Sequence, residues 1–107
     1  MANVSSDEAL GILRRVAIGE AVPRLKNPRQ QWDEETVELV VDGWHVSLFA
    51  DVTRSRHVNR VTSPDGRLGS SEDWRSDEEF SQQPEDRLYR EDSDAVDRMF
   101  QAFRRAR

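Results

Sequence analysis

The two histidines of this 107-residue chain, His45 and His57, are the side chains best suited to metal binding, and Asp51 lies between them. Imidazole and carboxylate groups bind zinc, but each must reach to about 2 Å from one ion. On paired strands the two histidines would lie about five residues apart, or roughly 16 Å. The chain has no HExxH spacing. We therefore interpret both as surface histidines and predict no metal site.

Acidic pairs and serines are abundant, but their surroundings do not indicate catalysis. Catalytic carboxyl pairs are held about 5 to 9 Å apart across a cleft with different pKa values, whereas pairs such as Glu85-Asp86 lie in polar segments. No serine lies in a Gly-x-Ser-x-Gly elbow. The segment Gly66-Arg67-Leu68-Gly69 is typical of a turn and not of a phosphate-binding loop. We predict no enzyme activity, no catalytic residue and no cofactor.

Basic residues are better candidates for a binding site. One cluster, in or beside a predicted strand, consists of Arg54, Arg56, His57, Arg60 and Arg67, and a second consists of Arg14, Arg15, Arg24, Lys26 and Arg29. Arginine side chains bind phosphates and carboxylates through paired N–H groups. The alternative, which we favour, is that the acidic stretch 72–97 folds against these clusters. That stretch holds eleven acidic residues and three arginines.

Aromatic residues add two further candidates. Trp74 lies among acidic residues and is either a packing anchor or an exposed contact, since exposed tryptophans are favoured at interfaces. Phe49 points away from the predicted core. The possible partner contacts are therefore Arg54, Arg56, Arg60, Arg67, Trp74 and Phe49.

A β-hairpin is the clearest structural pattern among the elements that position these residues. Two strand-forming runs, 36–41 and 44–50, are separated by Asp42-Gly43, which is typical of a type I′ turn. That turn sets the register and puts six apolar residues on one face, Val37, Leu39, Val41, Trp44, Val46 and Leu48. The other face pairs Val40 with His45, Glu38 with Ser47, and Thr36 with Phe49.

Amphipathic helices are predicted at both ends of the chain. Ser5 and Glu8 form a capping box before an apolar stripe, which predicts a helix over 6–18. Ser93 or Asp92 caps a second helix, whose apolar stripe includes Met99, Phe100 and Phe103. We expect this second helix to cover the face of the hairpin that holds Val40 and Phe49, joined there by Val58.

The remaining segments are less regular. The prolines in 20–31 predict an irregular connection, and 56–62 is expected to form an edge strand, followed by a Pro-Asp-Gly turn and a short strand at 67–69. The acidic segment 70–92 is expected to be a loosely ordered connection. The resulting prediction is one α+β domain over 1–107, with an antiparallel meander of three or four strands and a helix at each end.

Composition narrows the function classes. The formal charge of −5 argues against general affinity for nucleic acid or anionic membranes. The chain has no cysteine, which excludes disulfides and thiolate chemistry. No apolar run approaches the ~20 residues of a membrane helix, and the N-terminus lacks a signal-peptide pattern. We therefore expect a cytoplasmic protein.

Three short motifs resemble a family of small uncharacterised bacterial domains. They are Ala9-Leu10-Gly11 continuing through Arg14 to Glu20, Val41-Asp42-Gly43-Trp44, and Pro64-Asp65-Gly66-Arg67. The resemblance covers roughly 8–68 and implies a small bacterial cytoplasmic protein without implying an activity. Our interpretation is a non-catalytic protein-interaction module that binds another protein or forms a homodimer. The alternative is an arginine-mediated binder of nucleic acid or of a phosphorylated ligand.

Overall fold

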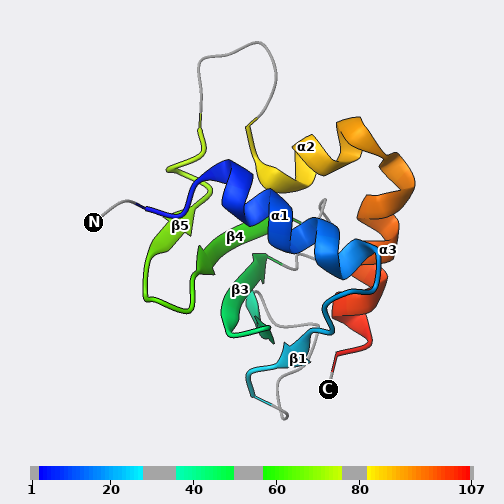
Figure 1. The fold of residues 1–107 in the computed structure, drawn as a ribbon, viewed down its shortest axis with the longest axis horizontal. Coiled ribbons are helices and arrows are strands. Elements are labelled where there is room, and N and C mark those ends of the chain that lie inside the picture. The colour runs from blue at the N-terminus through cyan, green and yellow to red at the C-terminus, as the bar shows by residue number, and fades with distance from the viewer. Residues whose placement is uncertain (1–2, 28–35, 50–56, 76–81, 107) are drawn as a thin grey trace.

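A computed structural model describes residues 3–27, 36–49, 57–75 and 82–106 of the chain. The fold is α+β, with five strands and three helices among these residues (Figure 1). In chain order the elements are α1 (Ser6–Ala17), β1 (Arg24–Leu25), β2 (Thr36–Val41), β3 (Trp44–Phe49), β4 (His57–Thr62), β5 (Leu68–Ser70), α2 (Pro84–Glu91) and α3 (Ser93–Arg104). The strands form one antiparallel sheet in the order β1-β2-β3-β4-β5.

The hairpin of β2 and β3 forms as predicted. Asp42 and Gly43 both have positive φ angles, 49° and 82°, as a type I′ turn requires. The register pairs Val41 with Trp44 and Leu39 with Val46, and it continues in step to Thr36 and Phe49. The alternation of strand side chains therefore separates a core face from a polar face along the whole hairpin.

The prediction of three or four strands is wrong, because β1 adds a fifth strand. Arg24 pairs with Val40, and Leu25 pairs with Leu39, within a segment that its prolines led us to expect as irregular. Two residues are too few for a period-2 pattern to be visible in the sequence. This strand exists because the outer edge of β2 offers backbone groups for pairing.

A register shift between β3 and β4 corrects the predicted position of Val58. Ser47 pairs with Arg60 but Leu48 pairs with Val58, so Asn59 is the extra residue of a β-bulge. The bulge allows Val58 and Val61, three positions apart, both to be completely buried. Val58 therefore belongs to the core face and does not extend an apolar patch on the other face.

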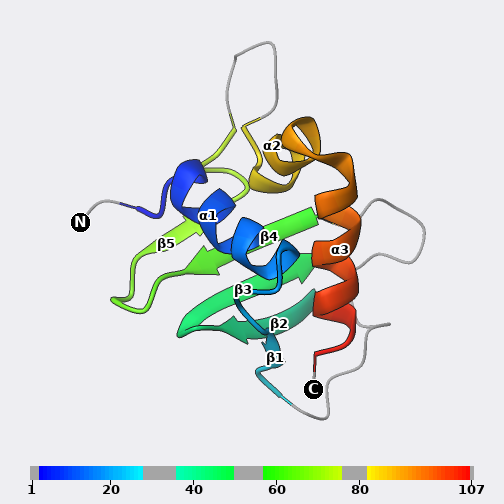
Figure 2. The same cartoon turned by 45° about the vertical axis from the view of Figure 1, so that its right-hand side comes forward.

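The helices lie together on the core face of the sheet (Figures 1 and 2). The capping box of α1 is present, because the Glu8 N–H donates to the Ser5 hydroxyl at 3.1 Å and the Ser5 N–H donates to the Glu8 carboxylate at 3.3 Å. Asp92 caps α3 by accepting from the Asp94 N–H at 3.1 Å. Leu10, Leu13, Leu39, Leu48, Met99 and Phe103 are among the fully buried side chains of the resulting core.

The prediction that the C-terminal helix covers Val40 and Phe49 is wrong. Figure 2 shows α3 on the same side of the sheet as α1, and Phe103 belongs to the core cluster that contains Leu39. The six apolar side chains of the hairpin's core face offer α3 much more apolar area than the other face does. Among the described residues, none of the helices therefore packs on the face that holds Val40.

A helix also forms inside the acidic segment that we expected to be loosely ordered. α2 begins at Pro84, which fixes a helical φ, and it buries Leu88 against α1 and α3. Residues 76–81 lie outside the described part of the chain. Within the described ranges, no helix is long and apolar enough to span a bilayer.

Candidate functional site

The sheet face opposite the helices is the surface with the most distinctive chemistry, and we call it the open face. Backbone register places Arg24 and Val40, then His45 and Thr62, on neighbouring positions of this face. The described positions of the open face include Arg24, Lys26, Glu38, Val40, His45, Ser47, Arg60 and Thr62. Among these described residues three are basic and one is acidic, although the whole chain has a charge of −5.

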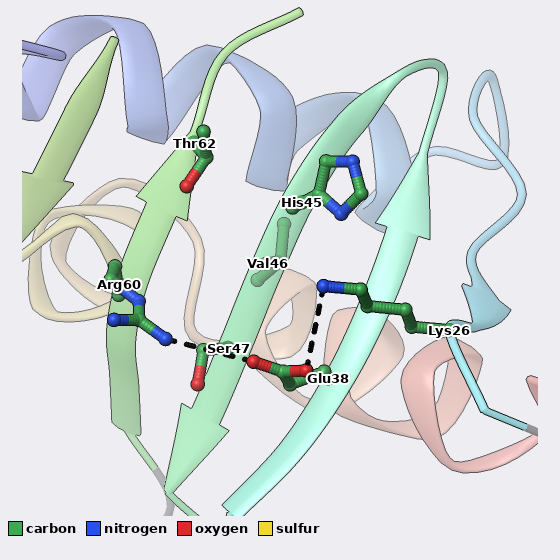
Figure 3. Close-up of a pocket in the computed structure, with 7 residues that line it drawn as sticks. All are labelled: Lys26, Glu38, His45, Val46, Ser47, Arg60 and Thr62. Carbon is green, nitrogen blue, oxygen red and sulfur yellow. Dashed lines mark ion pairs between the residues drawn. The ribbon is translucent and has the colours of Figure 1, made fainter. Parts of the chain in front are cut away.

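A hollow of about 270 Å³ lies in the middle of the open face (Figure 3). It is lined by Lys26, Glu38, His45, Val46, Ser47, Arg60 and Thr62, which come from four adjacent strands or their immediate flanks. A hollow of this size is close to the lower limit for small-ligand pockets. It is wide enough to admit a side chain or a peptide backbone from a partner.

Three residues in direct register form the floor and two walls of this hollow. Glu38 on β2 and Arg60 on β4 flank Ser47 on β3. Figure 3 shows the Arg60–Glu38 ion pair passing over the short serine side chain, with Lys26 reaching Glu38 from the other side. The N···O distances are 3.6 Å for Arg60 and 3.7 Å for Lys26. Because all three charged side chains are 41% to 51% exposed, each pair contributes only about 0.2–1 kcal/mol.

Ser47 is an exception to normal polar packing. Its side chain is 4% exposed, and no described residue forms a hydrogen bond with its hydroxyl. Leaving a buried hydroxyl without a partner costs about 1–3 kcal/mol. Ser47 is one of the residues that line the hollow, so an acceptor that displaces the side chains covering the hydroxyl would satisfy it.

Ser47, His45 and Glu38 are the residue types of a catalytic triad, but they are not arranged as one. A triad needs hydrogen bonds from the nucleophile to the base, at about 2.6–3.2 Å. The Ser47 hydroxyl has no such bond to a described residue, and Figure 3 shows it separated along β3 from the His45 ring. The geometry therefore supports binding through hydrogen bonds and charge better than nucleophilic catalysis.

The predicted contact residues are not all on the open face. Arg60 is in the hollow. Phe49 occupies an open-face position by register, opposite His57. Arg54 and Arg56 lie outside the described residues.

Arg67 makes ion pairs within the chain. Its guanidinium donates two hydrogen bonds to the Glu8 carboxylate, at 3.0 and 2.8 Å, and another to Asp65 at 3.0 Å. The hydrogen bond from Arg67 lowers the pKa of the Glu8 carboxyl. The pKa of Asp65 is also lowered, first by its hydrogen bond from Ser63 and then by Arg67. Arg67 therefore ties the β4–β5 turn to the first turn of α1.

Trp74 is buried, at 4% exposure, and acts as an anchor. Its indole N–H donates to the carbonyl oxygen of Val4 at 3.1 Å. Gly69 allows this close packing, because a Cβ atom there would lie 2.5 Å from the same oxygen and 3.0 Å from the indole ring. The residue thus joins the N-terminal segment to β5 and is not available as a surface contact.

The acidic stretch meets one of the basic clusters in part. Arg14 on α1 forms a two-pronged ion pair with Glu91 at the end of α2. That hydrogen bond raises the pKa of Arg14 and lowers the pKa of Glu91. On the opposite side of the sheet, Arg60 and Lys26 pair with Glu38 instead. The acidic stretch therefore neutralises a cation of the helix layer, while Lys26 and Arg60 on the open face pair with Glu38.

Glu85 was not predicted as a special residue, yet its carboxyl is buried between α2 and β4. Glu85 is only 7% exposed, and one of its carboxylate oxygens receives no hydrogen bond from a described residue. Burial raises its pKa to about 7, against the opposing effect of hydrogen bonds from its own N–H and from the Val58 N–H. The neighbouring Asp86 raises the pKa further. Nothing in the local sequence distinguishes Glu85 from the exposed acids around it.

Several residues of the hollow could have been found from the sequence. The Asp-Gly turn already placed Glu38 opposite Ser47 and His45 opposite Val40, on the polar face. Arg60 was chosen for its charge. Lys26 was assigned to a different cluster, because the strand that brings it to Glu38 was not foreseen.

A family model described as Domain of unknown function (DUF7693) matches residues 3–102. The chain belongs to this family. The match includes all five strands, α1 and α2 of the DUF7693 domain, and most of α3. Neither the curated proteins nor the solved structures gave a match.

Proposed function

We propose that this DUF7693 domain is a non-catalytic protein-interaction module of the bacterial cytoplasm, and that the open face is its contact surface. Support for the location comes from the cysteine-free composition, which suits a reducing compartment. Support for a bacterial source comes from the three short motifs described above.

The observation that carries the proposal is the buried, unpartnered hydroxyl of Ser47 in the middle of the open face. The helices bury the core on the other side of the sheet, so packing does not require Ser47 to be polar. A buried hydroxyl without an acceptor, next to two exposed cations, is a poor arrangement for stability and a good one for binding.

A non-catalytic role is favoured over an enzyme by the absence of an activated nucleophile at the hollow. The Ser47 hydroxyl donates no hydrogen bond to a described base. Among the described residues, no group of three histidine or acidic side chains is arranged to hold a metal ion. Binding by shape, charge and hydrogen bonds requires neither feature.

A second candidate function is arginine-mediated binding of nucleic acid or of a phosphorylated ligand. It is favoured by the excess of cations on the described part of the open face, where Arg24, Lys26 and Arg60 stand against Glu38. It is opposed by the charge of −5 on the whole chain, which repels a polyanion at long range.

Site-specific photocrosslinking in living cells tests the proposal. A photoreactive amino acid replaces Thr62 on the open face, and a control variant carries it at Gln101, exposed on α3. We expect one protein to crosslink from position 62 and not from position 101. Adding the charge-reversing change Arg60→Glu to the position-62 variant should abolish that product. Equal crosslinking from both positions, or none from position 62, would remove the open face as the contact surface.

A further inference from the structure

We infer that the open face accepts an acidic segment of the partner protein, whose carboxylate displaces Glu38 from Lys26 and Arg60. This inference rests on the proposed function and adds the chemistry of the partner. Glu38 then acts as an internal substitute for the partner's carboxylate while the surface is unoccupied.

The described part of the open face carries more positive than negative side chains. The described cations of the open face extend from β1 to β4, and they are Arg24, Lys26 and Arg60. Glu38 is the acidic residue between them among the described positions. In a chain with a net charge of −5, this positive area is local. Complementary charge across an interface sets orientation and partner choice, so a partner segment with carboxylates fits this area best.

The ion pairs that Glu38 forms with Lys26 and Arg60 are long. At 3.6 and 3.7 Å, their N···O distances exceed the 2.7–2.9 Å of strong charge-assisted hydrogen bonds. All three side chains are about half exposed, so the pairs are solvent-screened. A carboxylate from a partner can therefore replace Glu38 at little energetic cost.

The hollow contains both hydrogen-bond donors and a hydrogen-bond acceptor. Lys26 and Arg60 are donors, the Ser47 hydroxyl is a donor with no acceptor among the described residues, and Glu38 is an acceptor. A peptide offers both carboxylate acceptors and backbone N–H donors. A nucleic-acid backbone offers phosphate acceptors for the two cations but no N–H donor for the displaced Glu38 carboxylate. The hollow therefore favours an acidic peptide over RNA or DNA.

The test is selection of binders from a random-peptide library displayed on phage, with the full chain immobilised. We expect enrichment of sequences rich in Asp and Glu. Binding of a selected peptide, measured by fluorescence anisotropy, should weaken several-fold when sodium chloride rises from about 50 to about 500 mM. A random-sequence single-stranded RNA serves as the competing probe.

Three variants examine the site itself. The double variant Lys26→Gln/Arg60→Gln should weaken binding of the selected peptide at least about fivefold. Glu38→Gln should strengthen it about two- to fivefold, because the competing carboxylate is gone. The charge-matched controls are Arg104→Gln/Arg105→Gln, at the end of α3, and Asp97→Asn, within α3, all at exposed positions; they should change binding less than twofold. Thermal denaturation of each variant confirms that it is folded.

The outcomes separate the inference from the proposed function. The displacement of Glu38 is overturned if acidic peptides bind Glu38→Gln more weakly than the native chain. It is also overturned if their affinity is the same for the double variant and the native chain. If the selected peptides are neutral or basic and their binding depends on open-face residues, the inference of an acidic partner fails. The proposed interaction function still stands in that case. If no peptide is enriched, or if the RNA binds more tightly than any peptide, both the inference and the interaction module fail.

Discussion

Glu85 provides the sharpest quantitative prediction, because its buried carboxyl couples folding to pH. In the folded chain its pKa is about 7, and the ordinary value of 4.5 applies when the chain is unfolded. Since the unfolded state gives up this proton first, stability falls as the pH rises from 4.5 to about 7 and then stays level. At 1.36 kcal/mol per pH unit, the full loss is about 3 kcal/mol.

The variant Glu85→Gln keeps the shape of the side chain and removes its ionisation. We expect equal stability of variant and native chain at pH 4, and a variant more stable by up to about 3 kcal/mol at pH 8. Urea denaturation followed by circular dichroism gives the free energy of unfolding at each pH. Glu20→Gln, at an exposed position after α1, is the control and should leave the pH dependence unchanged.

The reasoning would be refuted by parallel stability curves of Glu85→Gln and the native chain between pH 5 and 8. It would also be refuted if the variant were less stable at pH 8. That second result would mean that the hydrogen bonds from the Val58 and Glu85 N–H groups outweigh the cost of burying the charge.

Three further predictions concern stability. Gly69→Ala should lower the free energy of unfolding by about 1–3 kcal/mol, because its Cβ would lie 2.5 Å from the Val4 carbonyl oxygen. The control is Gly11→Ala, in α1 with open space around it. This control should raise the free energy of unfolding by up to about 1 kcal/mol. Gly43→Val should cost about 1–3 kcal/mol at a φ of 82°, and an unchanged melting temperature would contradict the type I′ turn. Ser47→Ala should raise the melting temperature by removing an unsatisfied hydroxyl. The same variant should bind the selected peptide more weakly. A lower melting temperature would show that the hydroxyl is satisfied in the free chain.

Local patterns made much of the fold predictable. The turn at Asp42-Gly43 fixes the register of β2 and β3 within the hairpin itself. The capping box of α1 involves residues three positions apart. In both cases the interacting groups are near neighbours in the sequence, so their geometry follows from residue type and spacing.

The features that were missed depend on contacts between distant segments. β1 consists of two residues that are strand because β2 is beside them. The bulge after Val58 reflects the need to bury both Val58 and Val61. The apolar stripe of α3 shows that it must be buried, but not on which face of the sheet. The site inherits these limits, because Lys26 reaches Glu38 through β1.

Two of the buried polar atoms that lack a hydrogen bond in the described part of the chain, the Ser47 hydroxyl oxygen and one Glu85 carboxylate oxygen, have different consequences because they lie on different sides of the sheet. Glu85 is enclosed between α2 and β4, so ionisation of its buried carboxyl lowers the stability of the fold, and protonation restores that stability. Ser47 lies under the exposed Arg60–Glu38 ion pair, which a partner can displace without unfolding the chain. The Ser47 hydroxyl is already desolvated in the free chain. If a partner supplies its acceptor, the new hydrogen bond therefore makes binding more favourable. Under the proposed function, the hydroxyl that is slightly unfavourable for folding would favour association at the open face.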